Sequence, residues 1–334
     1  TNTGIYSPAA DVLAASVGGT PTWNASSTFG FKNRIINGAM VIDQRNAGAS
    51  VTPSASFGYT VDRWGAAEDT DGACTVQQVA DAPTGFVNSL KSTTTTADAS
   101  LGATQFSYIW QFIEGLNVSD FAWGSASAQT VTMSFWVKSS LTGTFGGALT
   151  NSAFNRSYPF TYAISVANTW EQKTVTIAGD ISGTWLTTNG VGIRVQFGLG
   201  VGSTYSGTAG NWAGSQFISA TGATSVIGTL SATWQVTGVQ LEKGSTATSF
   251  DYRSQGTELA LCQRYYQHYV FASGGVLPCS GVWRSSTRLD ANSMLSVEMR
   301  ATPTIATTNV GNIQVYDGGS SRAATAIADN GSRT

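Results

Sequence analysis

Strict alternation of apolar and polar residues is the feature that most constrains this chain. Val131, Met133, Phe135 and Val137 share one side of an extended segment, and mostly Thr, Ser and Trp occupy the other. The same period of two returns over residues 191–199. A period of two fits a strand with one buried face, whereas a helix would repeat every 3.6 residues. These segments are therefore predicted to be half-buried β-strands.

A second type of strand is expected where apolar residues are nearly continuous. Residues 106–113 are apolar at almost every position, which is typical of a strand covered on both faces. Further strands, separated by Gly, Asn, Asp and Ser, are predicted at 36–43, 73–80, 87–95, 160–166, 173–178 and 233–241. About nine strands with turn residues between them predict an all-β chain built around a jelly-roll-like sandwich of two sheets.

Composition supports this and excludes several classes of function. Ser and Thr make up about a quarter of the chain, and Gly contributes 38 residues against 7 Pro, a balance that suits strands and turns. Only 11% of the residues are charged and the net charge is -2, so no basic field is available for nucleic acid or for an anionic membrane surface. No apolar run reaches the roughly 18 residues of a membrane helix, so membrane insertion is not expected.

Three segments are predicted along the chain. Residues 1–30 hold few large apolar groups and are expected to pack against copies of themselves, as a β-rich oligomerisation or shaft-linking segment. Residues 31–256 form the sandwich. Residues 257–334 are predicted to begin with a short helix, capped by Thr257 with Glu258 in its first turn, and to continue as a second, smaller β domain.

The residues needed for enzymatic chemistry are scarce. His268 is the only histidine and lies in an aromatic stretch, where a packed or surface role is more common than a catalytic one. No Gly-x-Ser-x-Gly nucleophile motif precedes it. We therefore expect a protein that is not an enzyme, and we assign no catalytic residue.

One acidic cluster is a candidate for metal binding. Glu68, Asp69 and Asp71 lie close together before a glycine, and oxygen ligands on a loop suit a structural calcium ion, although solvated loop acids are the more common case. No other cofactor is expected. The three cysteines lack metal-binding spacing, and a disulfide between Cys262 and Cys279 remains open.

Aromatic residues outside the strand patterns suggest glycan binding. Sugars present flat C–H faces that pack on aromatic rings, and loops commonly display such rings. Trp123, Tyr205 and Trp212 lie outside the clean strands and are the candidate glycan platforms. The alternative is that these rings anchor loops by packing. The tryptophans beside strand patterns are assigned to packing: Trp64, Trp110, Trp136, Trp170 and Trp234.

Several segments resemble the C-terminal regions of tailed-bacteriophage tail fibre proteins, of the kind found in phages of cyanobacteria and marine bacteria. The segments that carry the resemblance are KNRIINGAM at 32–40, YTVDRW at 59–64, SFWVKS at 134–139, GVQLEKG at 238–244, SFDYR at 249–253 and TELALCQRYY at 257–266. Together these segments span about residues 33–266. They look like framework, with Asp62, Arg63 and Arg253 holding strand ends by charge-assisted bonds.

The resemblance implies an extracellular protein of the virion, a homotrimeric tail fibre whose sandwich is similar to carbohydrate-binding modules. Its implied partners are other tail or baseplate proteins and a polysaccharide of the host surface. Two alternatives remain. One is a collar, baseplate or head fibre that never contacts the receptor, and the other is a depolymerase that cuts the polysaccharide it binds, with carboxylates meeting across a trimer interface.

Overall fold

The computed structural model describes residues 32–269 and 295–304 in full, and outside them the backbone of seven short strands. Those strands are β1 (Gly4–Tyr6), β2 (Ala14–Val17) and β3 (Thr20–Asn24) near the N-terminus, and β17 (Cys279–Ser285), β18 (Arg288–Ser293), β19 (Gln314–Asp317) and β20 (Ser320–Ala323) near the C-terminus. They pair as one three-stranded sheet and two hairpins. The predicted oligomerisation of residues 1–30 lies outside the described residues.

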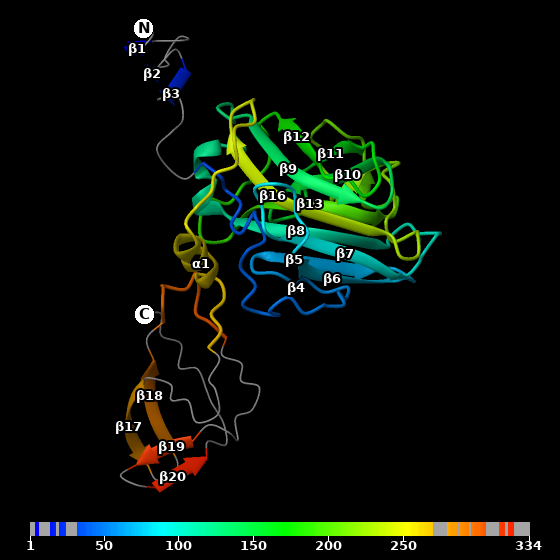
Figure 1. Ribbon diagram of the computed structural model, residues 1–334. Helices are drawn as coiled ribbons and strands as arrows, with labels where there is room; N and C mark the ends of the chain where they lie inside the picture. Colours follow the sequence, from blue (N-terminus) through cyan, green and yellow to red (C-terminus); the bar gives the residue numbers. More distant parts are fainter. Residues whose placement is uncertain are drawn as a thin grey trace.

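The body of the protein is a β-sandwich of two antiparallel sheets, drawn as stacked layers in Figure 1. The six-stranded sheet has the order β11-β10-β13-β8-β5-β4, and the five-stranded sheet has the order β12-β9-β16-β7-β6. The strand bounds of the first are β4 (Gly58–Tyr59), β5 (Trp64–Asp69), β8 (Phe106–Glu114), β10 (Gly143–Thr150), β11 (Ser157–Ile164) and β13 (Val191–Val201). Those of the second are β6 (Ala73–Val79), β7 (Ser89–Thr96), β9 (Val131–Ser139), β12 (Glu171–Ile177) and β16 (Thr233–Lys243). The predicted all-β sandwich is confirmed.

The core lies between the two sheets and follows the alternation in the sequence. Val131, Met133, Phe135 and Val137 of β9 are all fully buried, and the apolar positions of β13 face them from the other sheet. Phe197 of β13 lies 5.1 Å from Phe135, measured between ring centroids, in an edge-to-face arrangement. Burial of these aromatic and branched side chains is the main force that holds the sheets together.

Strand β8 is buried on both faces, as its continuous apolar run predicts. Ile109 and Ile113 point into the core between the sheets. Tyr108 and Trp110 point the other way, into a separate hydrophobic cluster on the outer face of the six-stranded sheet. A sandwich of two layers would leave that face to solvent, so a cover of loop residues must lie over it.

The short segments between strands complete the described fold. Two 3₁₀ helices, Gly115–Asn117 and Ser119–Phe121, follow β8, and a parallel pair of two-residue strands, β14 (Ser206–Gly207) and β15 (Ser219–Ala220), lies beyond β13. The helix α1 spans Gln255–Gln263 beside the sandwich (Figure 1). Among the described residues, no helix is long and apolar enough to cross a membrane.

The helix begins earlier than the sequence suggests. Ser254, not Thr257, is its N-cap, because the Ser254 side chain accepts a hydrogen bond from the Thr257 backbone N–H. Glu258 is buried, pairs with Arg253 at 3.3 Å and accepts a hydrogen bond from the backbone N–H of Asn37. Arg253 also donates to the Ile35 carbonyl at 3.1 Å, a charge-assisted bond to a segment outside the strands and not to a strand end.

One predicted strand is wrong. Residues 36–43 form turns, and Asn37 and Met40 have positive φ angles of 57° and 58°. Buried Asn37 holds the turn, because its side chain donates to the carbonyls of Ile42 and Asp62 at 2.8 and 2.9 Å. A left-handed backbone that is fixed by side-chain hydrogen bonds cannot continue a strand.

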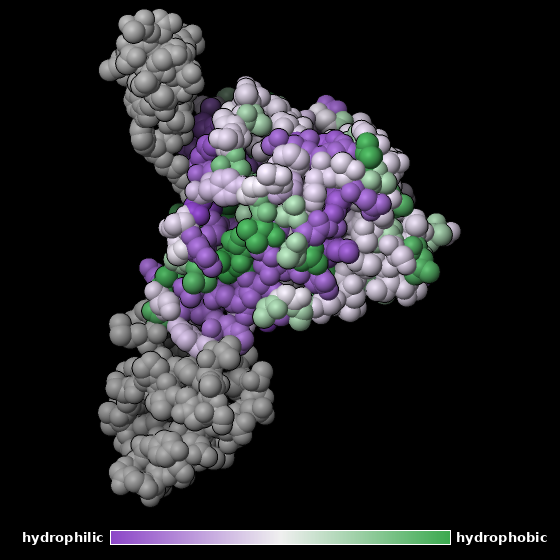
Figure 2. Space-filling view, in the orientation of Figure 1, coloured by the Kyte–Doolittle hydropathy of each residue, from purple (hydrophilic) through white to green (hydrophobic). Residues whose placement is uncertain are grey.

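The surface reflects the polar but weakly charged composition. Much of the face seen in Figure 2 is pale, the colour of intermediate hydropathy, with purple hydrophilic and green hydrophobic groups interspersed. A band of hydrophobic groups crosses this face near the middle of the sandwich.

Candidate functional site

The outer face of the six-stranded sheet carries a concentration of aromatic rings, which we call the aromatic face. It is defined by Phe57, Tyr59, Phe106, Tyr108, Trp110, Phe112, Phe154, Arg194 and Gln196. Its centre is β8, whose residues alternate between the core and this face. Two loops add further rings to this face. Phe57 precedes β4, Phe154 lies between β10 and β11, and the two rings stack with centroids 6.4 Å apart.

The rings of the aromatic face form one connected array. Trp110 and Phe112 stack with centroids 4.1 Å apart and an interplanar angle of 17°. Phe57 meets both rings edge-on, at 5.5 and 5.3 Å, and Tyr59 meets Trp110 at 5.0 Å. Trp110 is fully buried, whereas Phe57 is 48% exposed and is the most accessible ring of the array. Phe57 is therefore the ring of this array that a bound molecule could contact most readily.

Two polar side chains of β13 lie in register with these rings. Arg194 is paired with Phe112 and Gln196 with Trp110 across β8 and β13. The guanidinium of Arg194 lies 3.7 Å from the ring centroid of Phe154 and 5.2 Å from that of Phe112. Burial lowers the pKa of Arg194 to about 10, so the group is still a cation at neutral pH.

Several hydrogen-bond donors of the aromatic face have no acceptor. Arg194 Nε, Gln196 Nε2 and Trp110 Nε1 are buried without a hydrogen-bond partner, on three side chains that neighbour one another in the sheet. Ser219 Oγ, on the segment that covers Gly146 and Gly198 of the same sheet, is also without a partner. These are four of the nine such atoms in the described part of the chain. Buried donors without partners are costly, so their gathering at one place points to a ligand that supplies acceptors.

Carboxylates are nearly absent from this sheet. Its six strands contain only Glu68, Asp69 and Glu114. Glu114 is engaged, because Arg264 donates to its two oxygens at 2.8 and 3.1 Å and Tyr265 donates at 2.6 Å. Burial alone would raise the pKa of Glu114, but these hydrogen bonds outweigh it and lower the pKa below 4.5. An ionised, fully bonded carboxylate is a poor general acid.

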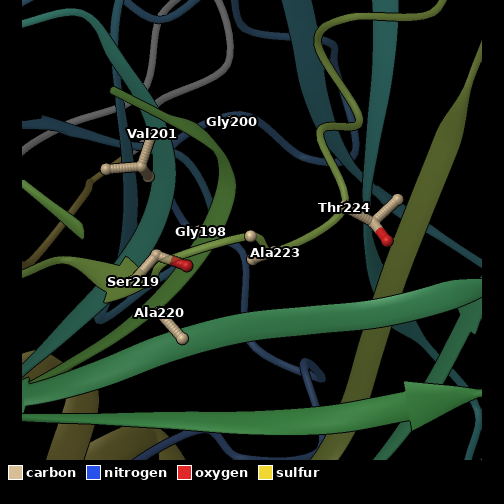
Figure 3. Close-up of a pocket in the computed structure, with 8 residues that line it drawn as sticks. Gly198, Gly200, Val201, Ser219, Ala220, Ala223 and Thr224 are labelled. Carbon is tan, nitrogen blue, oxygen red and sulfur yellow. The ribbon is translucent and has the colours of Figure 1, made fainter. Parts of the chain in front are cut away.

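A small cavity lies on the same face near the C-terminal end of β13, between this strand and the segment that carries β15 (Figure 3). It has a volume of about 30 Å³ and is lined by Gly198, Gly200, Ser219, Ala223 and Thr224 among others. The close approach of Ser219 requires glycine at position 198, because a Cβ there would lie 2.7 Å from the Ser219 hydroxyl. A space of this size suits a water molecule and is too small for a sugar ring.

The structure brings two of the three predicted glycan platforms together. Trp123 and Trp212 meet edge-to-face at 5.2 Å, and Trp185 meets them at 4.7 and 5.4 Å. The Trp123 Nε1–H donates to the Gln129 carbonyl and the Trp212 Nε1–H to the Ala178 carbonyl. Trp123 is only 8% exposed and belongs to the core. This geometry favours packing, and a glycan role for these two rings stays a prediction.

Tyr205 lies elsewhere, at the edge of the aromatic face. Its ring is 5.8 Å from Phe106 and packs against the outer hydrophobic cluster of the six-stranded sheet. It is half-buried and therefore still accessible. The three predicted residues are divided between two clusters and do not form one platform.

The three acidic residues predicted to bind calcium differ in their surroundings. Glu68 is buried and accepts hydrogen bonds from the backbone and hydroxyl of Thr70, while Asp69 and Asp71 are exposed. Burial raises the pKa of Glu68. In the fully described ranges, no group of three His, Cys, Asp or Glu side chains is placed to hold a metal ion. Calcium binding stays a prediction.

The remaining reactive side chains found in the sequence have structural surroundings. His268 is exposed, with Nδ1 2.7 Å from the carbonyl oxygen of Gln44. Cys74 and Cys262 are buried free thiols, and burial raises the pKa of Cys74 to about 11. The side chain of Cys279 lies outside the described residues.

The aromatic face was missed by the sequence reasoning because its residues come from segments far apart in the chain. Trp110 was assigned to packing, which its complete burial bears out. Arg194 and Gln196 belong to the polar half of the alternation in β13, so nothing in the pattern singles them out. One signal was present: a strand that is apolar on both sides must have something to cover its outer face.

Comparison with known proteins gives structural likenesses only. No family model and no curated protein sequence matches the chain. The bacteriophage CBA120 tailspike protein 4 enzymatically active domain matches 64% of this chain at 12% identity and a TM-score of 0.33, and the match spans 21% of the tailspike chain.

Carbohydrate-binding domains give similar values. The family 11 carbohydrate-binding module of Clostridium thermocellum, in complex with a mixed-linked tetrasaccharide, is covered completely at 12% identity and a TM-score of 0.31. The N-terminal cellulose-binding domain of a Cellulomonas fimi β-1,4-glucanase is 90% covered at 16% identity and a TM-score of 0.25. Identities of this size transfer no residue roles, so function must be argued from the residues of this chain.

Proposed function

We propose that this protein is a non-catalytic tail fibre protein of a tailed bacteriophage, which binds glycan on the host surface through its aromatic face. The observation that carries the proposal is the array of rings around Trp110 and Phe112 with unpartnered donors on Arg194 and Gln196 beside it. Aromatic rings pack against the C–H faces of a sugar, and the free N–H groups can donate hydrogen bonds to its oxygens. The resemblance to tail fibres supports placing this activity on a virion.

A homotrimer is part of the proposal. The scarcity of large apolar residues in 1–30 favours partner chains, and three weak sites held on one particle bind a repetitive polysaccharide far more tightly than one. Light scattering on the purified protein should give three times the chain mass. A monomer at micromolar concentration would remove this part of the proposal.

The absence of catalysis is supported by the state of the carboxylates. Hydrolysis of a glycosidic bond needs two carboxyl groups about 5–9.5 Å apart, one of them protonated. Arg264 and Tyr265 hold Glu114 in its ionised form. The strands β10 and β13, which lie beside the rings, contain no Asp or Glu.

One experiment tests binding and catalysis together. The purified protein is incubated with bacterial cells and with polysaccharides extracted from their surfaces, and both retention on the glycan and release of new reducing ends are followed. Retention without new reducing ends is the expected result. New reducing ends would make the protein a depolymerase, and no retention on any surface would overturn the receptor-binding role.

A further inference from the structure

The arginines of this protein show how a guanidinium binds a carboxylate here. Arg156 uses Nε and Nη2 to bind the two oxygens of Asp180 at 2.7 and 2.6 Å. Arg264 uses the same edge to bind Glu114 at 3.1 and 2.8 Å. This two-pronged arrangement is the strongest geometry available to an arginine and a carboxylate.

Arg194 lacks the carboxylate that those two arginines have. Its Nη1 donates to the carbonyl of Asn151, so the opposite edge, formed by Nε and Nη2, is the one left for a further partner. Nε is buried and without an acceptor. No described carboxylate lies close enough to Arg194 to pair with it, and the only ionisable group that influences it is Tyr108.

Leaving this cation without an anion has a cost. Arg194 is only 8% exposed, and a charge removed from water is poorly stabilised unless it is paired. The rings of Phe154 and Phe112 offset part of that cost through cation–π attraction. They supply no oxygen for Nε, so an anionic acceptor is still missing.

We propose that the aromatic face recognises an acidic glycan, whose uronic-acid carboxylate binds the Nε and Nη2 edge of Arg194 while the sugar ring packs on the neighbouring aromatic rings. This inference rests on the proposed glycan-binding function and specifies its ligand. Gln196 Nε2 and Trp110 Nε1, on fully buried side chains next to Arg194 in the sheet, are further donors without an acceptor.

Phe57 is the exposed ring nearest to the surroundings of Arg194. Phe57 touches Phe112 and Phe154, the same two rings that flank the guanidinium, and it is 48% exposed. Because Arg194 Nε is buried, binding of a carboxylate requires a side chain at this rim, such as that of Phe57, to move. The planar fork of arginine binds a carboxylate through two parallel hydrogen bonds, which also fixes the orientation of the uronic acid.

The test is a binding panel with matched ligands. Alginate, polygalacturonate and hyaluronan are each presented in native form and after carboxyl reduction, which turns the uronate into a neutral sugar on the same backbone. Dextran and dextran sulfate serve as neutral and sulfated references. We expect at least one native uronate polymer to bind, and its carboxyl-reduced form to bind at least about tenfold more weakly.

Variants connect that preference to Arg194. Arg194→Gln should lose the preference for the native over the reduced polymer, and Arg194→Lys should keep only a small part of it, because lysine cannot offer two parallel donors. Lys243→Gln makes the same change in net charge at an exposed position of the other sheet and should leave the preference unchanged. Thermal unfolding of each variant checks that the fold is intact.

The outcomes separate the two proposals. Equal binding of native and reduced polymers, or a preference for dextran sulfate over every uronate, would overturn the proposed recognition of a uronic-acid carboxylate and leave glycan binding standing. An unchanged preference in Arg194→Gln would remove Arg194 from the site. No binding to any polymer in the panel or to cell-surface polysaccharide would overturn the proposed function itself.

Discussion

Arg194 lies 3.7 Å from the ring centroid of Phe154, and its Nη1 also donates to the carbonyl of Asn151, where the loop that carries Phe154 begins. The loop 151–156 is thereby tied to β13 by one charged side chain. This contact joins the framework of the sheet to the rim of the aromatic face, so changes at either residue should affect both stability and binding.

Replacing Phe154 tests the cation–π contact. Phe154→Leu keeps an apolar side chain and removes the ring, so we expect a loss of about 0.5–2 kcal/mol in the free energy of unfolding. Urea denaturation measures the change. Phe154→Tyr keeps the ring and is the control; equal losses in the two variants would show that the contact with Arg194 contributes nothing.

Replacing Trp123 distinguishes packing from ligand display. Because Trp123 is 8% exposed and meets Trp185 and Trp212, Trp123→Ala should lower the free energy of unfolding by about 3–5 kcal/mol. Trp123→Phe loses the hydrogen bond to Gln129 and should cost about 1 kcal/mol. If Trp123→Ala melts like the parent protein but binds cells poorly, the original glycan-platform prediction is right and the packing interpretation fails.

Removing one hydroxyl tests the polar contact inside the core. Tyr162 and Trp234 are buried, and the Trp234 Nε1–H donates to the Tyr162 hydroxyl at 3.0 Å. Tyr162→Phe leaves that N–H without an acceptor and should cost about 1–3 kcal/mol. Tyr158→Phe, on the same strand, has no comparable hydrogen bond to lose and serves as the comparison. An equal loss of unfolding free energy in Tyr158→Phe would show that the Trp234–Tyr162 hydrogen bond is not the cause.

The pairing of Glu114 predicts a pH dependence of stability. Burial alone would raise the pKa of Glu114, but the hydrogen bonds from Arg264 and Tyr265 hold it below its ordinary 4.5. A carboxyl whose pKa is lowered on folding stabilises the protein fully above that ordinary value, and the contribution is lost as pH falls through the folded value. Glu114→Gln should therefore be less stable than the parent protein at pH 7. The difference between their free energies of unfolding should become smaller toward pH 3. Unfolding in urea at several pH values measures it, and a constant gap would argue against this coupling.

Much of the fold is predictable from local pattern, and particular residues show why. The strands at 131–138 and 191–199 alternate cleanly, since one face of each meets the core. The opposite face of the second strand is buried as well, so the prediction that this strand is half-buried is wrong. The strands β5 and β10 were not predicted, because Gly and Ala replace large apolar residues in WGAAED and GTFGGALT. Small residues are required there, as a Cβ at Gly65 would lie 2.3 Å from the Trp110 ring.

The candidate site was less predictable than the fold. Trp123, Tyr205 and Trp212 are predicted from the sequence as rings on loops, but loop position does not reveal whether a ring is buried. The aromatic face depends on the register that places Arg194 beside Phe112 and Gln196 beside Trp110. Such pairs are separated by more than eighty residues, and only the strand order of the sheet brings them together.

The most direct test of the central claim is to compare glycan binding by Phe57→Ala and Tyr252→Ala, using a surface polysaccharide that retains the parent protein. Both residues are exposed aromatics, at 48% and 59%, but Phe57 lies on the aromatic face and Tyr252 packs on Phe86 and Phe250 away from it. Loss of one stacking ring is worth about 1 kcal/mol, so Phe57→Ala should raise Kd about fivefold while Tyr252→Ala leaves it unchanged. Unchanged binding by Phe57→Ala, or an equal loss in both variants, would contradict the placement of the glycan on the aromatic face.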